Sequence, residues 1–154
     1  MKNNLLWSVL FTVLFVLPYS QLSAQMQDDK YEEGTVWTMT FIRTAPNQGD
    51  TYLNDLSNTW VASMEQAKSD GLILDYKILQ GNAANSDDYN LILMIENKNL
   101  ASFDPDQGAK AKWDAIEKKV RDAMGDKFDK VVKNYENIRD IQGTKVMREL
   151  HLKK

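Results

Sequence analysis

The chain has 154 residues, no cysteine and a formal net charge of −3. This mild acidity argues against nucleic acid and anionic membranes as partners, because both need a basic surface. The absence of cysteine excludes disulfides, zinc–thiolate sites, iron–sulfur clusters and a thiol nucleophile. A chain of this length can form one domain with a sizeable core.

Residues 1–24 have the three parts of a secretory signal peptide. Lys2 is the only charge, residues 5–17 form an apolar run, and a more polar segment ends in Ser23 and Ala24. The alternative is a retained membrane anchor, but a spanning helix needs roughly 20 apolar residues. We therefore expect cleavage between Ala24 and Gln25, export to the periplasm or the extracellular space, and no membrane contact afterwards.

Residues 25–34 are polar and aperiodic, and are expected to form a flexible lead-in. A single α+β domain is expected over residues 35–154. It begins with a strand at residues 35–44, which is rich in β-branched and aromatic residues. One face of this strand carries three large apolar side chains, Trp37, Met39 and Phe41.

The next element is expected to be a helix from Asp50, whose carboxylate would cap the first turn, to Gly71 at its C-terminal end. Between them apolar residues recur three and four apart, as on one helix face. Strands are then expected at residues 72–80 and 89–96, with a loop of small residues between them. The apolar run at residues 91–95 predicts that this strand is covered on both faces.

A second helix is expected over residues 109–125, followed by an amphipathic stretch at 128–135 and a last strand at 144–152. Residues 138–141 fit either the end of the helix or a short extra strand. The order β-α-β-β-α(α)-β is the split βαβ pattern, which predicts a ferredoxin-like fold. Its four-stranded antiparallel sheet has helices on one face.

The first and third expected strands are apolar on both faces, and helices would cover only one of them. The other face would be an exposed patch larger than roughly a few hundred Å². A second copy of the same sheet, packed face to face about a two-fold axis, is an economical cover. The alternative is that residues 128–135 wrap round and cover that face.

This pattern of a two-faced sheet resembles the dimeric α/β-barrel superfamily of ferredoxin-like folds. Segments 36–41, 71–73 with 76–79, and 143–150 also resemble small exported bacterial proteins of unassigned function. The resemblance implies a homodimer that is non-catalytic or binds a small apolar ligand. A cofactor-independent monooxygenase or isomerase is the alternative it implies.

The superfamily also contains haem-degrading oxygenases, which typically combine an Asn on the first strand with a haem-ligating His farther along the chain. This sequence has no Asn in residues 35–44, and its only His is on the last expected strand. No cofactor is therefore expected.

Seven residues are candidates for a pocket on this fold: Trp37, Met39, Phe41, Tyr76, Arg148, Glu149 and His151. The four aromatic or Met side chains suit a flat apolar ligand, although an ordinary core would use them too. His151 is the only imidazole and the first choice for a general base near neutral pH. A solvent-facing position on a terminal strand is the simpler interpretation. If Arg148 and Glu149 are buried, they indicate a functional site. If they are exposed, they are simply the solvated end of a strand.

No metal site is expected. Residues 104–108 resemble the start of a calcium loop, but Gly108 and Ala115 stand at the fifth and twelfth positions, which need oxygen ligands. Asp104 or Asp106 is better explained as the cap of the helix that follows.

Overall fold

The computed structural model describes residues 30–154. The predicted signal peptide at residues 1–24, its cleavage site and the first residues of the expected lead-in lie outside the described residues. Within residues 30–154, no helix is long and apolar enough to cross a membrane.

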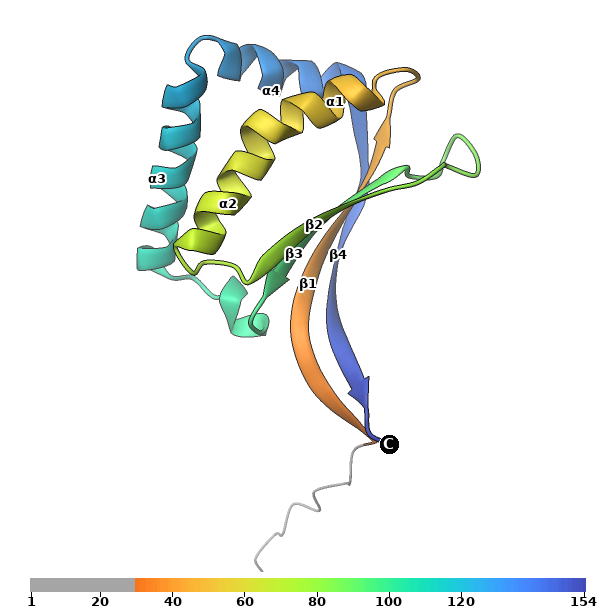
Figure 1. Ribbon diagram of the computed structural model, residues 1–154, viewed down its shortest axis with the longest axis vertical. Coiled ribbons are helices and arrows are strands. Elements are labelled where there is room, and N and C mark those ends of the chain that lie inside the picture. The colour runs from red at the N-terminus through yellow and green to blue at the C-terminus, as the bar shows by residue number, and fades with distance from the viewer. Residues whose placement is uncertain (1–29) are drawn as a thin grey trace, which may run out of the picture.

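The described part of the chain forms one antiparallel sheet with a layer of helices on one face (Figure 1). The strands are β1 (Tyr31–Thr44), β2 (Asp75–Gln80), β3 (Leu91–Asn97) and β4 (Arg139–Leu152). The helices are α1 (Gly49–Leu56), α2 (Ala62–Ser69), α3 (Gln107–Met124) and α4 (Lys127–Ile138). A π-helical turn (Ser57–Val61) joins α1 to α2, and a 3₁₀ turn (Leu100–Phe103) precedes α3.

The strand order is β2-β3-β1-β4, and every neighbouring pair is antiparallel. This is the order that the split βαβ pattern predicts. The predicted α+β class and the ferredoxin-like sheet are therefore confirmed.

β1 begins at Tyr31, so the prediction that the lead-in stays flexible as far as Gly34 is wrong. Residues 31–33 are paired with residues 150–152 at the end of β4. Residues 31–34 and 149–152 thus form a two-stranded ribbon that extends beyond the rest of the sheet (Figure 1). Their polar composition did not indicate a strand, because the pairing comes from residues more than a hundred positions away.

α1, the π-helical turn and α2 form one continuous helical segment, as the apolar spacing predicted. The prediction that Asp50 caps it is wrong: Gln48 is the N-cap and makes no side-chain capping bond. Asp50 lies in the first turn, where its charge still favours the helix dipole. The C-terminal prediction is confirmed, because Gly71 has a φ of 71° and Leu72 N–H donates to the Ala67 carbonyl at 2.9 Å.

The remaining boundaries also differ slightly from the sequence pattern. The undecided residues 138–141 are divided between two elements. Ile138 is the last residue of α4, and residues 139–141 begin β4. The predicted cap of α3 is confirmed at Asp106, whose carboxylate accepts a hydrogen bond from Ala109 N–H at 2.9 Å.

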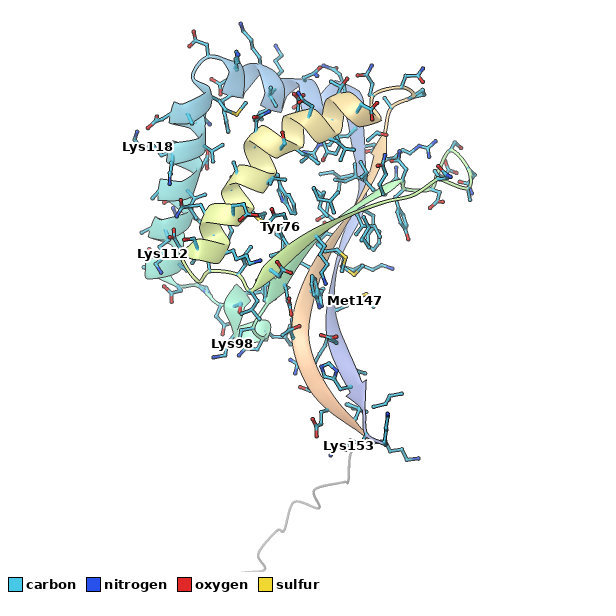
Figure 2. All side chains as sticks on the ribbon, viewed as in Figure 1. Tyr76, Lys98, Lys112, Lys118, Met147 and Lys153 are labelled. Atoms are coloured by element: carbon cyan, nitrogen blue, oxygen red, sulfur yellow. The ribbon has the colours of Figure 1, made fainter. Side chains whose placement is uncertain are left out.

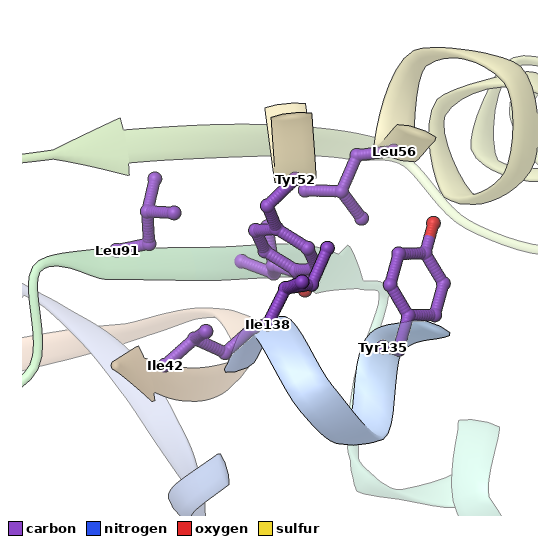
Figure 3. Packing of buried hydrophobic residues seen from close by; sticks show 7 residues of the cluster. Ile42, Tyr52, Leu56, Leu91, Tyr135 and Ile138 are labelled. Carbon is purple, nitrogen blue, oxygen red and sulfur yellow. The ribbon is translucent and has the colours of Figure 1, made fainter. Parts of the chain in front are cut away.

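The core lies between the sheet and the helices. One buried cluster, shown in Figure 3, contains Ile42, Tyr52, Leu56, Leu91, Leu93, Tyr135 and Ile138. A second cluster contains Met64, Ala67, Ile73 and Ile116. α4 therefore packs on the same face of the sheet as α1, and the alternative in which residues 128–135 cover the opposite face is wrong.

Candidate functional site

The face of the sheet that points away from the helices carries a large apolar surface. Val36 and Ile42 of β1 are buried on the helix side, so the residues that alternate with them point to the opposite side. The strand register places seven apolar side chains there: Trp37, Met39, Phe41, Leu79, Ile92, Met94 and Met147. These residues, with Tyr89 beside Phe41, are called the open face.

No helix of the described chain lies over the open face (Figure 1). In Figure 2, Met147 lies on the side of the sheet away from the helices, whereas Tyr76 points towards α2. Met147 is 52% exposed and Tyr89 is 39% exposed. The open face covers four strands that lie about 4.8 Å apart and about five residues along each strand at about 3.4 Å per residue. These dimensions correspond to an area of roughly 350 Å². Within one chain β3 is covered only on the helix side, so the predicted cover of its other face needs a second chain.

Two lysines flank the middle of the open face. Lys77 on β2 pairs with Met94, and Lys145 on β4 pairs with Met39, so both belong to one row across the sheet. Lys77 Nζ lies 4.6 Å from the centre of the Trp37 ring. Each lysine thus places its ammonium group over an aromatic ring of the open face, Trp37 for Lys77 and Phe41 for Lys145.

The end of the open face nearest the ribbon is acidic. Thr35 Oγ1 donates to Glu96 Oε1 at 2.7 Å and lies 3.3 Å from Glu149 Oε2. His151 packs on the backbone of Gly34, where an added Cβ would lie 2.7 Å from His151 Nε2. Among residues 30–154, no group of three or more carboxylates and histidines is arranged to hold a metal ion.

The structure separates the seven residues that the sequence suggested. Five of them lie on the open face or on its continuation along the ribbon: Trp37, Met39, Phe41, Glu149 and His151. Tyr76 and Arg148 lie on the helix side. Arg148 forms an ion pair with Glu33.

Tyr76 is held on the helix side by two contacts. Its hydroxyl donates to Glu65 Oε1 at 2.5 Å, and its ring packs edge-on against Trp60 at 5.4 Å. The hydrogen bond to Glu65 raises the pKa of Tyr76 to about 12. The phenol is therefore a fixed donor and not a base at neutral pH.

Two shallow hollows lie on either side of Tyr89, at the end of the open face nearest the β2–β3 connection. The first, of about 320 Å³, is lined by Phe41, Tyr89, Gln142, Gly143, Thr144 and Lys145. The second, of about 290 Å³, is lined by Leu79, Gln80, Gly81, Asn82, Asp88, Tyr89, Asn90 and Ile92. Sequence reasoning missed Tyr89, Gly143 and both lysines, because their neighbours on the open face are far away in the sequence. The strand register pairs Gly143 with Phe41, Lys145 with Met39 and Lys77 with Met94, and the Tyr89 ring packs on Phe41.

The sequence matches no protein-family model, and no curated protein is significantly similar to it. The solved structures that are similar to the chain include the following two. HapK from Hahella chejuensis is 14% identical, with a TM-score of 0.41, over 77% of this chain and 96% of HapK. A dimeric ferredoxin-like protein from an uncultured marine organism is 12% identical, with a TM-score of 0.40, over 80% of this chain and 91% of that one.

Proposed function

We propose that this protein is exported and acts as a homodimer that binds a small apolar ligand at the open face of its sheet. The observation that carries the proposal is the open face itself, in which seven apolar side chains from four strands have no cover within the described chain. A contiguous apolar patch of roughly 300–600 Å² is the size of the largest patch on a typical monomer, and such a patch is often functional.

A second copy of this chain is the partner that the charges favour. Lys77 and Lys145 flank the middle of the open face, whereas Glu96 and Glu149 lie at its ribbon end. A two-fold axis that crosses the strands midway between the row of Glu96 and the row of the two lysines would bring the acidic end of one copy over the basic middle of the other. In that arrangement the face is complementary to itself, as a two-fold interface requires.

A ligand site is supported by the kind of apolar residue that the face uses. Met39, Met94 and Met147 are flexible side chains that adapt to irregular partners. Sheets are twisted, so two sheets packed face to face separate towards their ends. The two hollows beside Tyr89 lie at such an end, where a small molecule would fit between the copies.

Export is supported by the sequence, in which residues 1–24 have the charge, the apolar run and the small residues of a signal peptide. A domain without cysteine needs no oxidising compartment to fold. Its stability after export would come from the two buried clusters under the helices.

A cofactor-independent monooxygenase or isomerase is the second candidate function, and one observation favours it. Glu96 and Glu149 both reach the hydroxyl of Thr35 at the ribbon end of the open face. One hydroxyl donates to one carboxylate at a time, so the other stays available as a base towards a compound on this face. Turnover that E96Q and E149Q abolish, with binding unchanged, would support this function.

The proposal is tested by native mass spectrometry of the full chain expressed in an exporting host and purified gently. Its mass reports cleavage, the number of copies and any retained small molecule together. We expect a dimer of chains that begin at Gln25. Uncleaved or strictly monomeric protein would contradict the proposal.

A further inference from the structure

We propose that the hollow beside Gly143 binds a small aromatic acid, with its ring against Phe41 and Tyr89 and its carboxylate on Lys145. This deepens the proposed function, because it names the class of ligand that the open face takes. All of the residues involved belong to one chain, so the site can be tested whether or not the protein is a dimer.

Two aromatic rings form one wall of the hollow. Phe41 and Tyr89 have ring centroids 4.7 Å apart and are tilted by 54°. Phe41 comes from β1, and Tyr89 comes from the connection that leads into β3. Tilted rings at this separation present both a face and an edge, which are the two surfaces against which a further aromatic ring packs well.

The empty volume is explained by Gly143. It is the cross-strand partner of Phe41, so the position that Lys145 and Met147 fill in the neighbouring rows has no side chain here. A Cβ built at Gly143 would meet no atom within 4 Å. The hollow of about 320 Å³ is at the lower end of the size of small-molecule sites.

Lys145 gives the hollow its charge. Its Nζ lies 5.6 Å from the centre of the Phe41 ring, and Lys145 forms no ion pair within residues 30–154. An acid whose ring lies beside Phe41 would place its carboxylate within reach of this ammonium group. A charge-assisted hydrogen bond at the rim of an apolar hollow favours the acid over a neutral compound of the same shape.

Lys77 provides the matched comparison. It lies over Trp37 much as Lys145 lies over Phe41, and each lysine has a methionine as its neighbour in the row, Met94 for Lys77 and Met39 for Lys145. Lys77 lines neither of the two hollows beside Tyr89. The open face therefore has two similar lysines, and only one of them borders a place for a ring.

The probe is 2-naphthoate, with 2-naphthamide as its uncharged counterpart, titrated into the purified exported protein by calorimetry and amide NMR. We expect 2-naphthoate to bind at least fivefold more tightly than the amide and to shift the Gly143 resonance. K145Q should weaken binding roughly five- to tenfold, as expected for one partly solvated charged contact, and K77Q should leave it unchanged. G143V should abolish binding by filling the hollow, whereas G81A, beside the other hollow, should not.

The proposal is overturned by equal affinity for acid and amide, by equal effects of K77Q and K145Q, or by unchanged binding to G143V. Failure to bind 2-naphthoate at millimolar concentration also overturns it. Sizing of the same samples keeps the two proposals separate. A dimer that does not bind the acid contradicts only this site, and a monomer that binds it contradicts only the homodimer.

Discussion

Gly143 is paired directly with Phe41 across β4 and β1, so the aromatic ring has no side chain beside it on the edge strand. The next two β4 positions on the same face are Lys145 and Met147, and both are large. The open face therefore combines a nearly continuous apolar surface with one gap at its end. A second sheet would cover the surface, and a small ring would fill the gap.

The gap at Gly143 also predicts a gain in stability. Gly143 is not among the glycines with positive φ, and its Cβ direction is open. Valine prefers strands and loses less backbone freedom on folding, so G143V should raise the free energy of unfolding by about 0.5–1 kcal/mol in urea denaturation. Gly125 is the control, because its Cβ direction is also open but its φ is 56°. G125V should be destabilising, and equal effects of the two substitutions would contradict this explanation.

Gly34 should behave in the opposite way. A Cβ there would lie 2.7 Å from His151 Nε2 and 3.1 Å from Glu149 Cβ. We expect G34A to displace the imidazole and to lower the free energy of unfolding by about 1 kcal/mol. Amide exchange at residues 31–33 should become faster. Adding H151A should recover only part of the loss, and an unchanged imidazole resonance in G34A would show that the contact is absent.

Tyr52 and Tyr135 pack edge to face at 5.3 Å but differ in hydrogen bonding (Figure 3). The Tyr135 hydroxyl lies 2.5 Å from Thr59 Oγ1, whereas the buried Tyr52 hydroxyl has no partner among the described residues. Y135F should therefore lower the free energy of unfolding by about 1 kcal/mol. Y52F should be neutral or stabilising by up to about 1 kcal/mol. Equal losses in the two variants would contradict the assignment.

The same tyrosines predict alkaline sensitivity. Burial raises the pKa of Tyr52 to about 12, although the Arg139 guanidinium acts in the opposite direction, and burial also raises the pKa of Tyr135. The unfolded phenol ionises near pH 10, so their contribution is complete below pH 10 and is lost as pH rises towards 12. Urea midpoints should fall over this window, and Y52F should make the fall shallower. A fall of the same steepness in Y52F would contradict the assignment to Tyr52.

The sequence predicted the order of elements because local signals mark it. Gly71 and Leu72 ended the first helix as expected, and Asp106 capped α3. Apart from the N-cap of α1, which is Gln48 and not Asp50, its failures come from long-range pairing. The start of β1 at Tyr31 depends on Leu152, and neither residue shows this pairing in its own neighbourhood.

Only part of the candidate site could be predicted, because the rest again depends on long-range pairing. Alternation along one strand put Trp37, Met39 and Phe41 on one face, and the structure agrees. It could not show that Tyr76 belongs to the other face, because that depends on which residue of β3 it pairs with. The hollow was not predictable, since a missing side chain at Gly143 has meaning only once its partner is known.

Sedimentation of the purified protein across a concentration series, with two matched variants, tests the central claim most directly. Met147 lies on the open face and Val132 on α4, and they are 52% and 43% exposed. If the open face is the dimer interface, the wild type and V132E sediment as dimers and M147E sediments as a folded monomer. A wild type that stays monomeric at high concentration, or an M147E variant that dimerises like the wild type, would contradict the account.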